Sequence, residues 1–280
     1  MQAPTRPLQP APLPFEEAAL KTERIGRPLL SYRAVASTNS VARNAANAGA
    51  AEGTAIVAQA QTAGRGRHGR TWTSSPGKNL TFSLILRPGL DVTDLGLIQI
   101  AAAVSAAESI EAHVTGCRCA LKWPNDVLLE TRKICGILME SSVPAGAREP
   151  AFVVLGVGVN VNQDSFPAGF PIQPTSILLE SGRSAAPGEV LLQFLSRFER
   201  EYDGMQKDHG SAARSKYISR LVDLGSEVAY RTTGDDTTVR GTITGISETG
   251  ALLLELPDGT IESLHSGDVT TRTADVADAT

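Results

Sequence analysis

The chain has 280 residues, which is enough for one or two domains with a substantial core. Hydrophobic residues make up 41% of it and charged residues 20%, as in ordinary soluble globular proteins. Its formal net charge of -4 argues against a protein that binds nucleic acid through bulk electrostatic attraction.

The first 14 residues contain five prolines and no signal-peptide pattern, so residues 1–14 are expected to form a disordered leader. No stretch approaches about 18 consecutive apolar residues, so no membrane span is expected. Cys117, Cys119 and Cys135 are too few and wrongly spaced for a disulfide framework or a zinc knuckle. They are interpreted as inert thiols of a reducing, cytoplasmic compartment.

Hydrophobic periodicity, caps and turn residues predict a domain of mixed helices and strands over 15–223. Strands are expected at 28–35, 53–59, 79–87, 118–123, 127–129, 134–140 and 151–159. Helices are expected at 15–24, from Ser37 or Thr38 to Gly49, and at 94–114, 176–181, 187–207 and 211–221. Ser37 and Thr38 suit the N-cap of their helix, and spacing alone does not choose between capping and ligand binding.

Beyond about Asp223 the pattern changes to short strands, expected at 227–230, 238–247, 251–256 and 260–264. Turn residues separate them, including Asp258-Gly259, and Asp-Gly between apolar runs favours a hairpin. We therefore place a domain boundary near Asp223 and expect a small SH3-like β-barrel over 224–273. Residues 274–280 are expected to be a frayed tail.

One loop concentrates the candidate chemistry of the first domain. Three glycines and three arginines occupy six of the seven positions of Gly64-Arg65-Gly66-Arg67-His68-Gly69-Arg70. Glycine lets backbone amides approach a ligand closely, and arginine grips carboxylate and phosphate through paired hydrogen bonds. This combination indicates a loop that closes over a dense anion.

The glycine spacing also matches the dinucleotide fingerprint, but a Rossmann turn opens a helix, whereas Trp72, the Pro76-Gly77 turn and another strand follow here. The Gly-Lys-Ser/Thr ending of a Walker A loop is absent. A single-strand nucleic-acid patch would need more aromatic residues than the nearby Trp72. A merely solvated loop would not need arginines separated by glycines. A site for a small carboxylic acid and a nucleoside triphosphate fits best, because fixed cations can neutralise two anions that must meet.

The run Gln61-Thr-Ala-Gly-Arg-Gly-Arg-His-Gly-Arg-Thr-Trp72 resembles the biotin loop of biotin–protein ligases. Three further blocks agree with that family in order and spacing: Ser37-Thr38-Asn39; Lys122-Trp123-Pro124-Asn125-Asp126 followed by Arg132-Lys133-Ile134-Cys135-Gly136-Ile137-Leu138; and Gly156-Val157-Gly158-Val159-Asn160. The resemblance covers about 25–270. It implies an α+β fold whose mixed or antiparallel sheet and helices are like a class II aminoacyl-tRNA synthetase, with the SH3-like barrel behind.

The resemblance also implies roles for individual residues. Lys133 and Arg65 would be the catalytic residues, and Lys133 would reach both the biotin carboxylate and the α-phosphate. Asp126 would either help to hold Mg²⁺ or only cap its turn. Biotin would be bound by Ser37, Thr38, Asn39, Gln61, Gly64, Arg65, Lys133, Gly136, Leu138 and Gly156, and ATP or the adenylate by Arg67, Arg70, Trp72, Asn125, Lys133, Asn160 and Arg272.

The implied reaction uses ATP and Mg²⁺ to convert biotin into biotinyl-5′-AMP, then transfers biotin to a lysine of a biotin carboxyl carrier domain. That carrier belongs to acetyl-CoA carboxylase or a related carboxylase. No permanently bound cofactor and no covalent enzyme intermediate are expected. Fewer than about forty residues precede the Ser37 block, so a monofunctional ligase without a DNA-binding domain is expected, either monomeric or homodimeric. A lipoate–protein ligase of the same fold and a non-catalytic biotin or nucleotide sensor are the alternatives.

Overall fold

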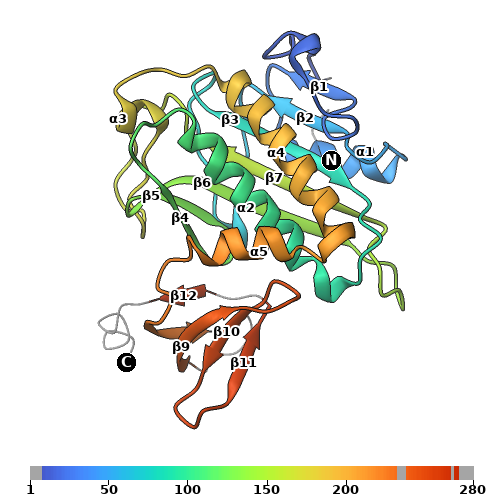
Figure 1. Cartoon of the computed structure of the whole chain (residues 1–280). Coiled ribbons are helices and arrows are strands. Elements are labelled where there is room, and N and C mark those ends of the chain that lie inside the picture. Colours follow the sequence, from blue (N-terminus) through green and yellow to red (C-terminus); the bar gives the residue numbers. More distant parts are fainter. Residues whose placement is uncertain (1–7, 232–237, 266–267, 271–280) are drawn as a thin grey trace, which may run out of the picture.

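Seven strands form a mixed sheet that carries helices on both faces (Figure 1). The computed structural model describes residues 8–231, 238–265 and 268–270. Only β1 and β2 run parallel, and every other neighbouring pair is antiparallel. In sheet order the strands are β1 (Leu29–Tyr32), β2 (Ala55–Ala58), β3 (Leu80–Leu86), β7 (Phe152–Val159), β6 (Arg132–Ser142), β5 (Asp126–Leu129) and β4 (Cys119–Lys122).

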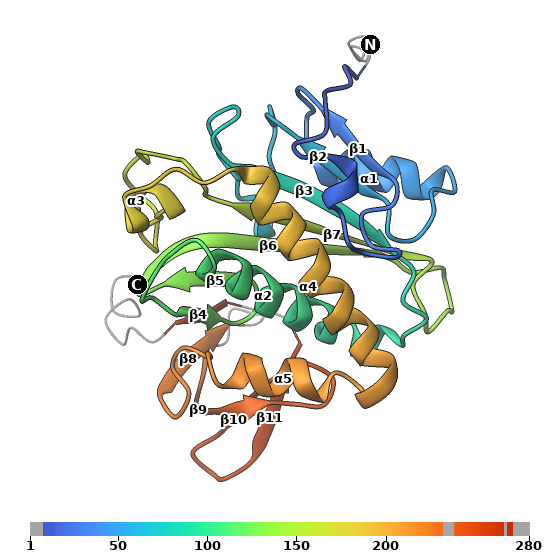
Figure 2. The same cartoon turned by 45° about the horizontal axis from the view of Figure 1, so that its top comes forward.

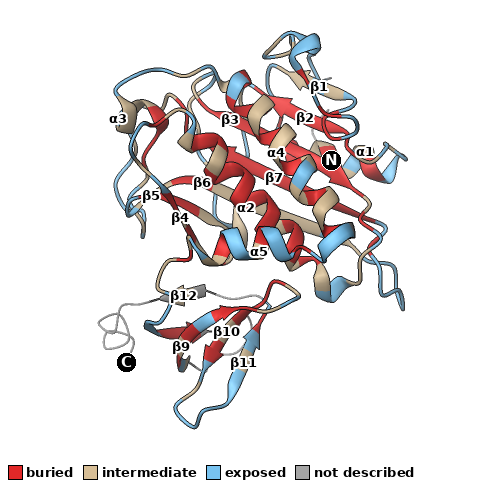
Figure 3. Ribbon diagram, in the orientation of Figure 1, coloured by how far each residue is buried: buried red, intermediate tan, exposed pale blue. Residues whose placement is uncertain are grey.

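The two faces of the sheet differ in what covers them. The helices α2 (Gly96–Glu111) and α4 (Pro187–Asp208) cross one face, with α5 (Ser211–Ile218) against α2 (Figure 2). The helix α1 (Thr38–Asn47) packs on β2, β3 and β7 from the opposite side. The short α3 (Ile177–Ser181) follows the irregular segment after β7. Because both faces are covered there, β3 and β7 are buried along their whole length (Figure 3).

Side chains along β7 alternate between the two faces of the sheet, and this alternation shows which β7 residues lie on the face that carries α1. Val153 and Leu155 belong to the large core beneath α2 and α4, whereas Phe152 and Val154 belong to the smaller core beneath α1. The period of two then carries positions 156 and 158 onto the α1 face, and both are glycine. These two glycines leave room on the α1 face of β7 for side chains that come from other elements.

Both edges of the large sheet are paired with irregular segments of the same chain. Along β1, the Ala11 amide donates to the Ser31 carbonyl at 2.8 Å. Along β4, the Leu121 amide donates to the Arg220 carbonyl at 2.8 Å, and Val222 returns a bond to Leu121 at 2.9 Å. The second pairing comes from the connection to the C-terminal domain, so that connection is fixed to the sheet.

The C-terminal domain is an antiparallel five-stranded sheet in the order β11-β10-β9-β8-β12, drawn in red below α5 in Figure 1. Its turn at Thr249-Gly250 meets the start of α2. A Cβ on Gly96 would lie 2.7 Å from the Thr249 carbonyl oxygen, so only glycine allows this approach. The strands are β8 (Glu227–Arg231), β9 (Thr238–Ile246), β10 (Leu252–Glu255), β11 (Ile261–Leu264) and β12 (Asp268–Thr270).

Most predicted elements are confirmed, and the errors lie near the chain ends. The helix expected at 15–24 is wrong: only a 3-10 turn, Glu17–Ala19, forms. The amides of Glu23, Arg24 and Ile25 bond instead to the Glu199 carboxylate of α4. Residues 8–14 of the expected leader are ordered, since 9–11 pair with 31–33. The pattern did not predict β12, and the expected tail at 274–280 lies outside the described residues.

Candidate functional site

A cleft of about 1120 Å³ opens on the α1 face of the sheet, beside the first turn of α1. Its walls are the 64–72 loop, the turn before β5 and the segment 166–174. The predicted site residues that line it are Ser37, Thr38, Asn39, Gln61, Arg65, Arg67, Arg70, Trp72, Asn125, Asp126, Lys133, Gly136, Leu138, Gly156 and Asn160. Gly64 lies in the loop behind the lining, and Arg272 lies outside the described residues.

One end of the cleft is a buried pocket of neutral hydrogen-bonding groups. The Thr38 amide donates to Gln61 Oε1 at 2.8 Å, and the Thr38 hydroxyl lies 3.2 Å from the same oxygen. Ser83, fully buried on β3, places its hydroxyl 2.8 Å from Thr38 Oγ1 and 2.6 Å from Asn39 Oδ1. Ser37 is the N-cap of α1, but its side chain makes no capping hydrogen bond. This end suits a neutral polar head better than a charged one.

Glycine pairs form the floor of the cleft. Gly136 and Gly158 face each other across β6 and β7, and the indole of Trp72 lies on both. A Cβ would come within 2.9 Å of Trp72 Cζ3 at Gly136 and within 2.5 Å of Trp72 Cε2 at Gly158. At Gly156 it would lie 2.0 Å from Asn39 Oδ1. The glycines therefore make room for two side chains of the site, rather than for flexibility.

The 64–72 loop folds back on itself as a narrow ladder. The Gly66 amide donates to the Arg70 carbonyl at 2.7 Å, and the Trp72 amide donates to the Gly64 carbonyl at 3.1 Å. A Cβ on Gly64 would lie 2.2 Å from the Trp72 carbonyl oxygen, so this crossing requires glycine. The ladder turns Arg65 toward Glu140 at 2.7 Å, and Arg67 Nη1 donates to Asn125 Oδ1 at 3.3 Å. The loop thus presents two guanidinium groups along the cleft.

Lys133 supplies a cation beside the cleft floor, since its Nζ would lie 3.5 Å from a Cβ on Gly136. Its Nζ lies 2.6 Å from Asp126 Oδ1 and 5.9 Å from the centroid of the Trp72 ring. The backbone of Lys133 pairs with the 173–175 segment, which fixes where the side chain starts. Two buried polar atoms nearby, Asn160 Oδ1 and Trp72 Nε1, have no hydrogen-bond partner among the described residues. Buried polar atoms of this kind are expected to bond to a ligand or water.

The cysteines take no part in this site. Cys119 and Cys135 are buried, and burial raises the pKa of Cys119 to about 12 and raises the pKa of Cys135 as well. All three cysteines are free thiols, as the sequence predicted. Among the described residues, no group of three His, Cys, Asp or Glu side chains is arranged to hold a metal ion.

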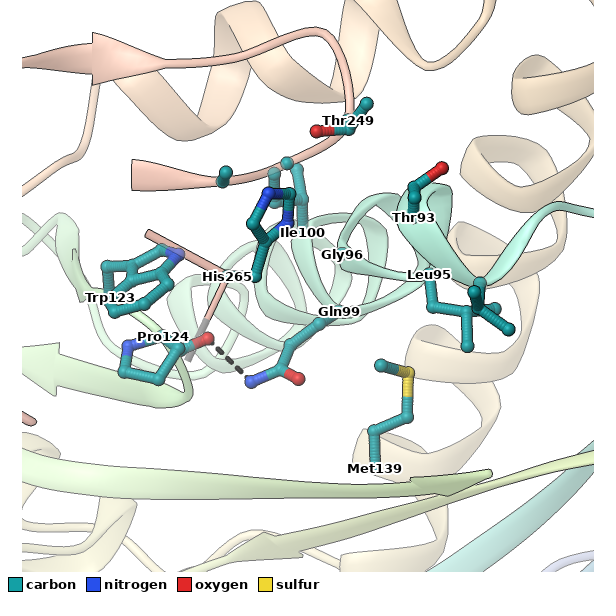
Figure 4. Close-up of a pocket in the computed structure, with 13 residues that line it drawn as sticks. Thr93, Leu95, Gly96, Gln99, Ile100, Trp123, Pro124, Met139, Thr249 and His265 are labelled. Atoms are coloured by element: carbon teal, nitrogen blue, oxygen red, sulfur yellow. Dashed lines mark hydrogen bonds between the residues drawn. The ribbon is translucent and has the colours of Figure 1, made fainter. Parts of the chain in front are cut away.

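A second, smaller cavity of about 200 Å³ lies between the start of α2 and the C-terminal sheet (Figure 4). Trp123 and Pro124 line both cavities and separate them. Gln99 Nε2 donates to the Pro124 carbonyl at 2.6 Å, drawn as the dashed line in Figure 4. This bond supports the turn that presents Asn125 and Asp126 to the cleft.

Three residues that the sequence reasoning missed belong to the geometry of the site. Gly158 lies beneath Trp72, Ser83 joins Thr38 to Asn39, and Glu140 binds Arg65. Gly158 stands inside a block that had been singled out, so its spacing from Gly156 was a usable signal. A serine and a glutamate inside strands gave no such signal.

Comparisons with known proteins agree with this geometry. The sequence pattern of the biotin/lipoate A/B protein ligase family matches residues 31–160, and that of the biotin protein ligase C terminal domain matches 223–272. The bifunctional ligase/repressor BirA of Bacillus spizizenii is 35% identical over 89% of this chain and 76% of its own length. The biotin–[acetyl-CoA-carboxylase] ligase of Mycobacterium tuberculosis is 31% identical over 91% of this chain and 95% of its own.

A solved structure shares the architecture. The biotin protein ligase from Aquifex aeolicus in complex with biotin and ATP superposes with a TM-score of 0.73 at 30% identity, covering 87% of this chain and 98% of that one. Within the described part of the chain, no helix is long and apolar enough to span a membrane.

Proposed function

This chain belongs to the biotin/lipoate A/B protein ligase family, and we propose that it activates biotin with ATP and transfers it to a carboxylase carrier domain. One observation carries the proposal: the neutral Thr38–Gln61 pocket and the Lys133 cation lie in one cleft beside an arginine loop. Biotin has this polarity, with a neutral ureido head at one end and a carboxylate at the other.

In the proposed first step, the pocket at Thr38 and Gln61 binds the ureido ring, and the valerate chain extends from it toward Lys133. The carboxylate then attacks the α-phosphorus of ATP in line, and pyrophosphate leaves. Lys133 and Arg65 neutralise the two anions that must meet, a kind of contact whose removal typically costs about 10²–10³ in rate. The product is biotinyl-5′-AMP.

We place the nucleotide at the other end of the cleft. The Trp72 indole offers a flat face for adenine, and the free Asn160 Oδ1 accepts a hydrogen bond from the adenylate. Arg67 and Arg70 are assigned to the triphosphate, Arg272 to the nucleotide end of the site, and Asn125 to the adenylate. Mg²⁺ would enter with ATP and would be held by phosphate oxygens and water, with one or two carboxylates from the protein, as is usual for this ion. Asp126, the ion-pair partner of Lys133, would be the residue to supply a carboxylate oxygen.

In the proposed second step, a lysine amine of the carrier domain attacks the acyl carbonyl of the mixed anhydride. The amide bond forms, AMP leaves, and the amine loses its proton. The nucleophile comes from the partner, so no covalent bond to the enzyme is needed. Closure of the 64–72 loop excludes the water that would otherwise hydrolyse the intermediate.

The proposal extends to the fold class, the location and the assembly of the protein. The C-terminal sheet is assigned to the SH3-like barrel class, and the catalytic domain to the class II synthetase-like fold. The acidic net charge supports an enzyme that does not bind DNA as a repressor, and the free thiols support a cytoplasmic location. The protein is proposed to act as a monomer or a homodimer.

The test is a pair of assays on the purified protein. Biotin-dependent exchange of pyrophosphate into ATP measures the first step, and transfer of labelled biotin to a carrier domain measures the second. Lipoate replaces biotin in a parallel arm. Exchange with biotin and not lipoate supports the proposal. Exchange with lipoate alone identifies a lipoate ligase, and calorimetric binding of biotin without any exchange identifies a sensor.

A further inference from the structure

Glu140, on β6 at the edge of the cleft, joins the arginine loop to helix α1. Its Oε1 lies 2.7 Å from Arg65 Nη2 and 3.0 Å from Arg43 Nη2. Its Oε2 accepts a hydrogen bond from Asn39 Nδ2 at 2.9 Å. Only 14% of the Glu140 side chain is exposed, so these three donors supply much of what water would otherwise provide.

The sheet and the helix both direct side chains to this point. Gly136, Leu138 and Glu140 alternate along β6 and share the face that forms the cleft. Asn39 and Arg43 are one turn apart on α1, so both reach the same carboxylate. Glu140 is thus built into rigid elements, whereas Arg65 belongs to a loop. The rigid partner in such a pair determines where the flexible one lies.

A chain of hydrogen bonds continues from Glu140 to the neutral pocket. Asn39 donates to Glu140 through Nδ2, and its Oδ1 lies 2.6 Å from Ser83 Oγ. Ser83 Oγ in turn lies 2.8 Å from Thr38 Oγ1, which lies 3.2 Å from Gln61 Oε1. The same network therefore touches the pocket for the neutral head and the loop arginine.

The charges indicate that Glu140 anchors Arg65 and does not compete with a substrate anion for it. One carboxylate lies between two guanidinium groups, which leaves the trio with a formal charge of +1. An arginine has five N–H donors, and Glu140 meets Arg65 through one terminal nitrogen. An incoming carboxylate can bind the remaining donors while the ion pair persists. Without Glu140, Arg43 and Arg65 would repel each other.

We propose that Glu140 is a positioning residue, which holds Arg65 over the cleft and thereby keeps the acyl-adenylate bound. This proposal rests on the proposed function, because the adenylate is the product of that function's first step. It assigns Glu140 no contact with the reacting atoms. Its effect passes through Arg65, so the two residues act as one unit.

The test measures release of the intermediate. Protein loaded with radiolabelled biotin and ATP is passed through a rapid desalting column, and loss of bound biotinyl-AMP is timed. Glu140→Gln keeps the shape and an acceptor for Asn39, and we expect release about tenfold faster, since bonds to charged groups are the strong ones. Glu255→Gln, on an exposed position of β10, is the matched control and should release at the wild-type rate. Release from Glu140→Gln at the wild-type rate overturns the proposal.

A double-mutant cycle separates positioning from general structural damage. Arg65→Ala should accelerate release as Glu140→Gln does, and the double variant should be no faster than Arg65→Ala. If the double variant accelerated release by the product of the two single-variant accelerations, Glu140 would act independently of Arg65, and the proposal would be overturned. The KM for biotin should change less than the release rate, whereas collapse of the pocket would change both.

Two further arms keep the result interpretable. If Glu140→Gln does not fold, Glu140→Asp retains the charge but shortens the reach, and release should still be several-fold faster; a wild-type rate there counts against the proposal. A wild-type protein that forms no biotinyl-AMP refutes the proposed function itself. That outcome is visible before any variant is compared.

Discussion

Lys133 Nζ lies 2.6 Å from Asp126 Oδ1, so the central cation of the cleft is held by a carboxylate from the adjacent strand. Asp126 pairs with Gly136 across β5 and β6, and a Cβ on Gly136 would lie 3.5 Å from Lys133 Nζ, so the lysine side chain lies over the residue that Asp126 faces. Side-chain exposure is 27% for Lys133 and 15% for Asp126. In this half-buried setting, a direct charge interaction is worth more than on the surface, and it keeps the flexible lysine aimed at the floor.

The first prediction concerns Lys133. Lys133→Ala removes the cation that meets both substrate anions, and we expect pyrophosphate exchange to fall by about 10²–10³ or more. The measurement is biotin-dependent exchange at saturating biotin and ATP. Lys207→Ala, at the exposed end of α4, should retain full exchange. Full pyrophosphate exchange in Lys133→Ala would show that Lys133 is not needed for adenylate formation.

The second prediction concerns the glycine floor. Gly158→Ala places a Cβ 2.5 Å from Trp72 Cε2, so the indole must move away from the glycine floor. We expect a changed tryptophan emission spectrum and a raised KM for ATP. The control is Gly204→Ala in α4, where the nearest atom would be Asp208 Oδ1 at 3.9 Å. That control should stabilise the helix by up to about 1 kcal/mol. An unaltered KM for ATP in Gly158→Ala would argue against a nucleotide at Trp72.

The third prediction concerns the neutral pocket. Thr38→Val keeps the volume but loses the hydroxyl between Ser83 and Gln61. An unpaired buried polar group costs about 1–3 kcal/mol, so biotin should bind roughly tenfold to a hundredfold more weakly. Isothermal calorimetry with biotin alone measures this. Thr244→Val, on an exposed strand position, supplies the comparison and should bind biotin normally. Unchanged affinity for biotin in Thr38→Val would show that the ureido ring binds away from Thr38.

The fourth prediction concerns the thiols. With a pKa of about 12, Cys119 is thiolate in roughly one molecule in ten thousand at pH 8, and burial blocks access as well. A maleimide at pH 8 should therefore modify the half-buried Cys117 first and leave Cys119 and Cys135 intact until the protein unfolds. Peptide mass spectrometry reads the positions. Rapid labelling of Cys135 in the native protein would contradict its burial beneath the cleft.

Local sequence signals located the strands and most helices because the apolar pattern of each of these segments agrees with the way the segment is buried. The alternation at 79–87 and the apolar run at 151–159 became β3 and β7. The end of the helix expected at 15–24 did not form because the amides of Glu23 and Arg24 bond to the carboxylate of Glu199, about 175 residues away. No local pattern contains that partner.

At the cleft too, residues in recognisable local motifs were predicted, and a residue that depends on distant partners was missed. Thr38, Gln61 and Lys133 were identified through their blocks, and the structure brings them to one cavity. Glu140 was missed because a glutamate near the end of a strand is usually a solvated residue. Its role depends on Asn39, Arg43 and Arg65, which approach only when α1 and the loop are packed against β6.

The segments that line the two sheet edges have a consequence for the protein's behaviour at high concentration. An exposed edge strand offers unpaired amides and carbonyls to any other chain, and such edges template aggregation. Here residues 9–11 occupy positions along β1, and 220–222 occupy positions along β4. A protein that lacks residues 1–14 would leave the backbone of β1 unpaired beside the exposed Leu30, and would lose colloidal stability before it lost its catalytic cleft.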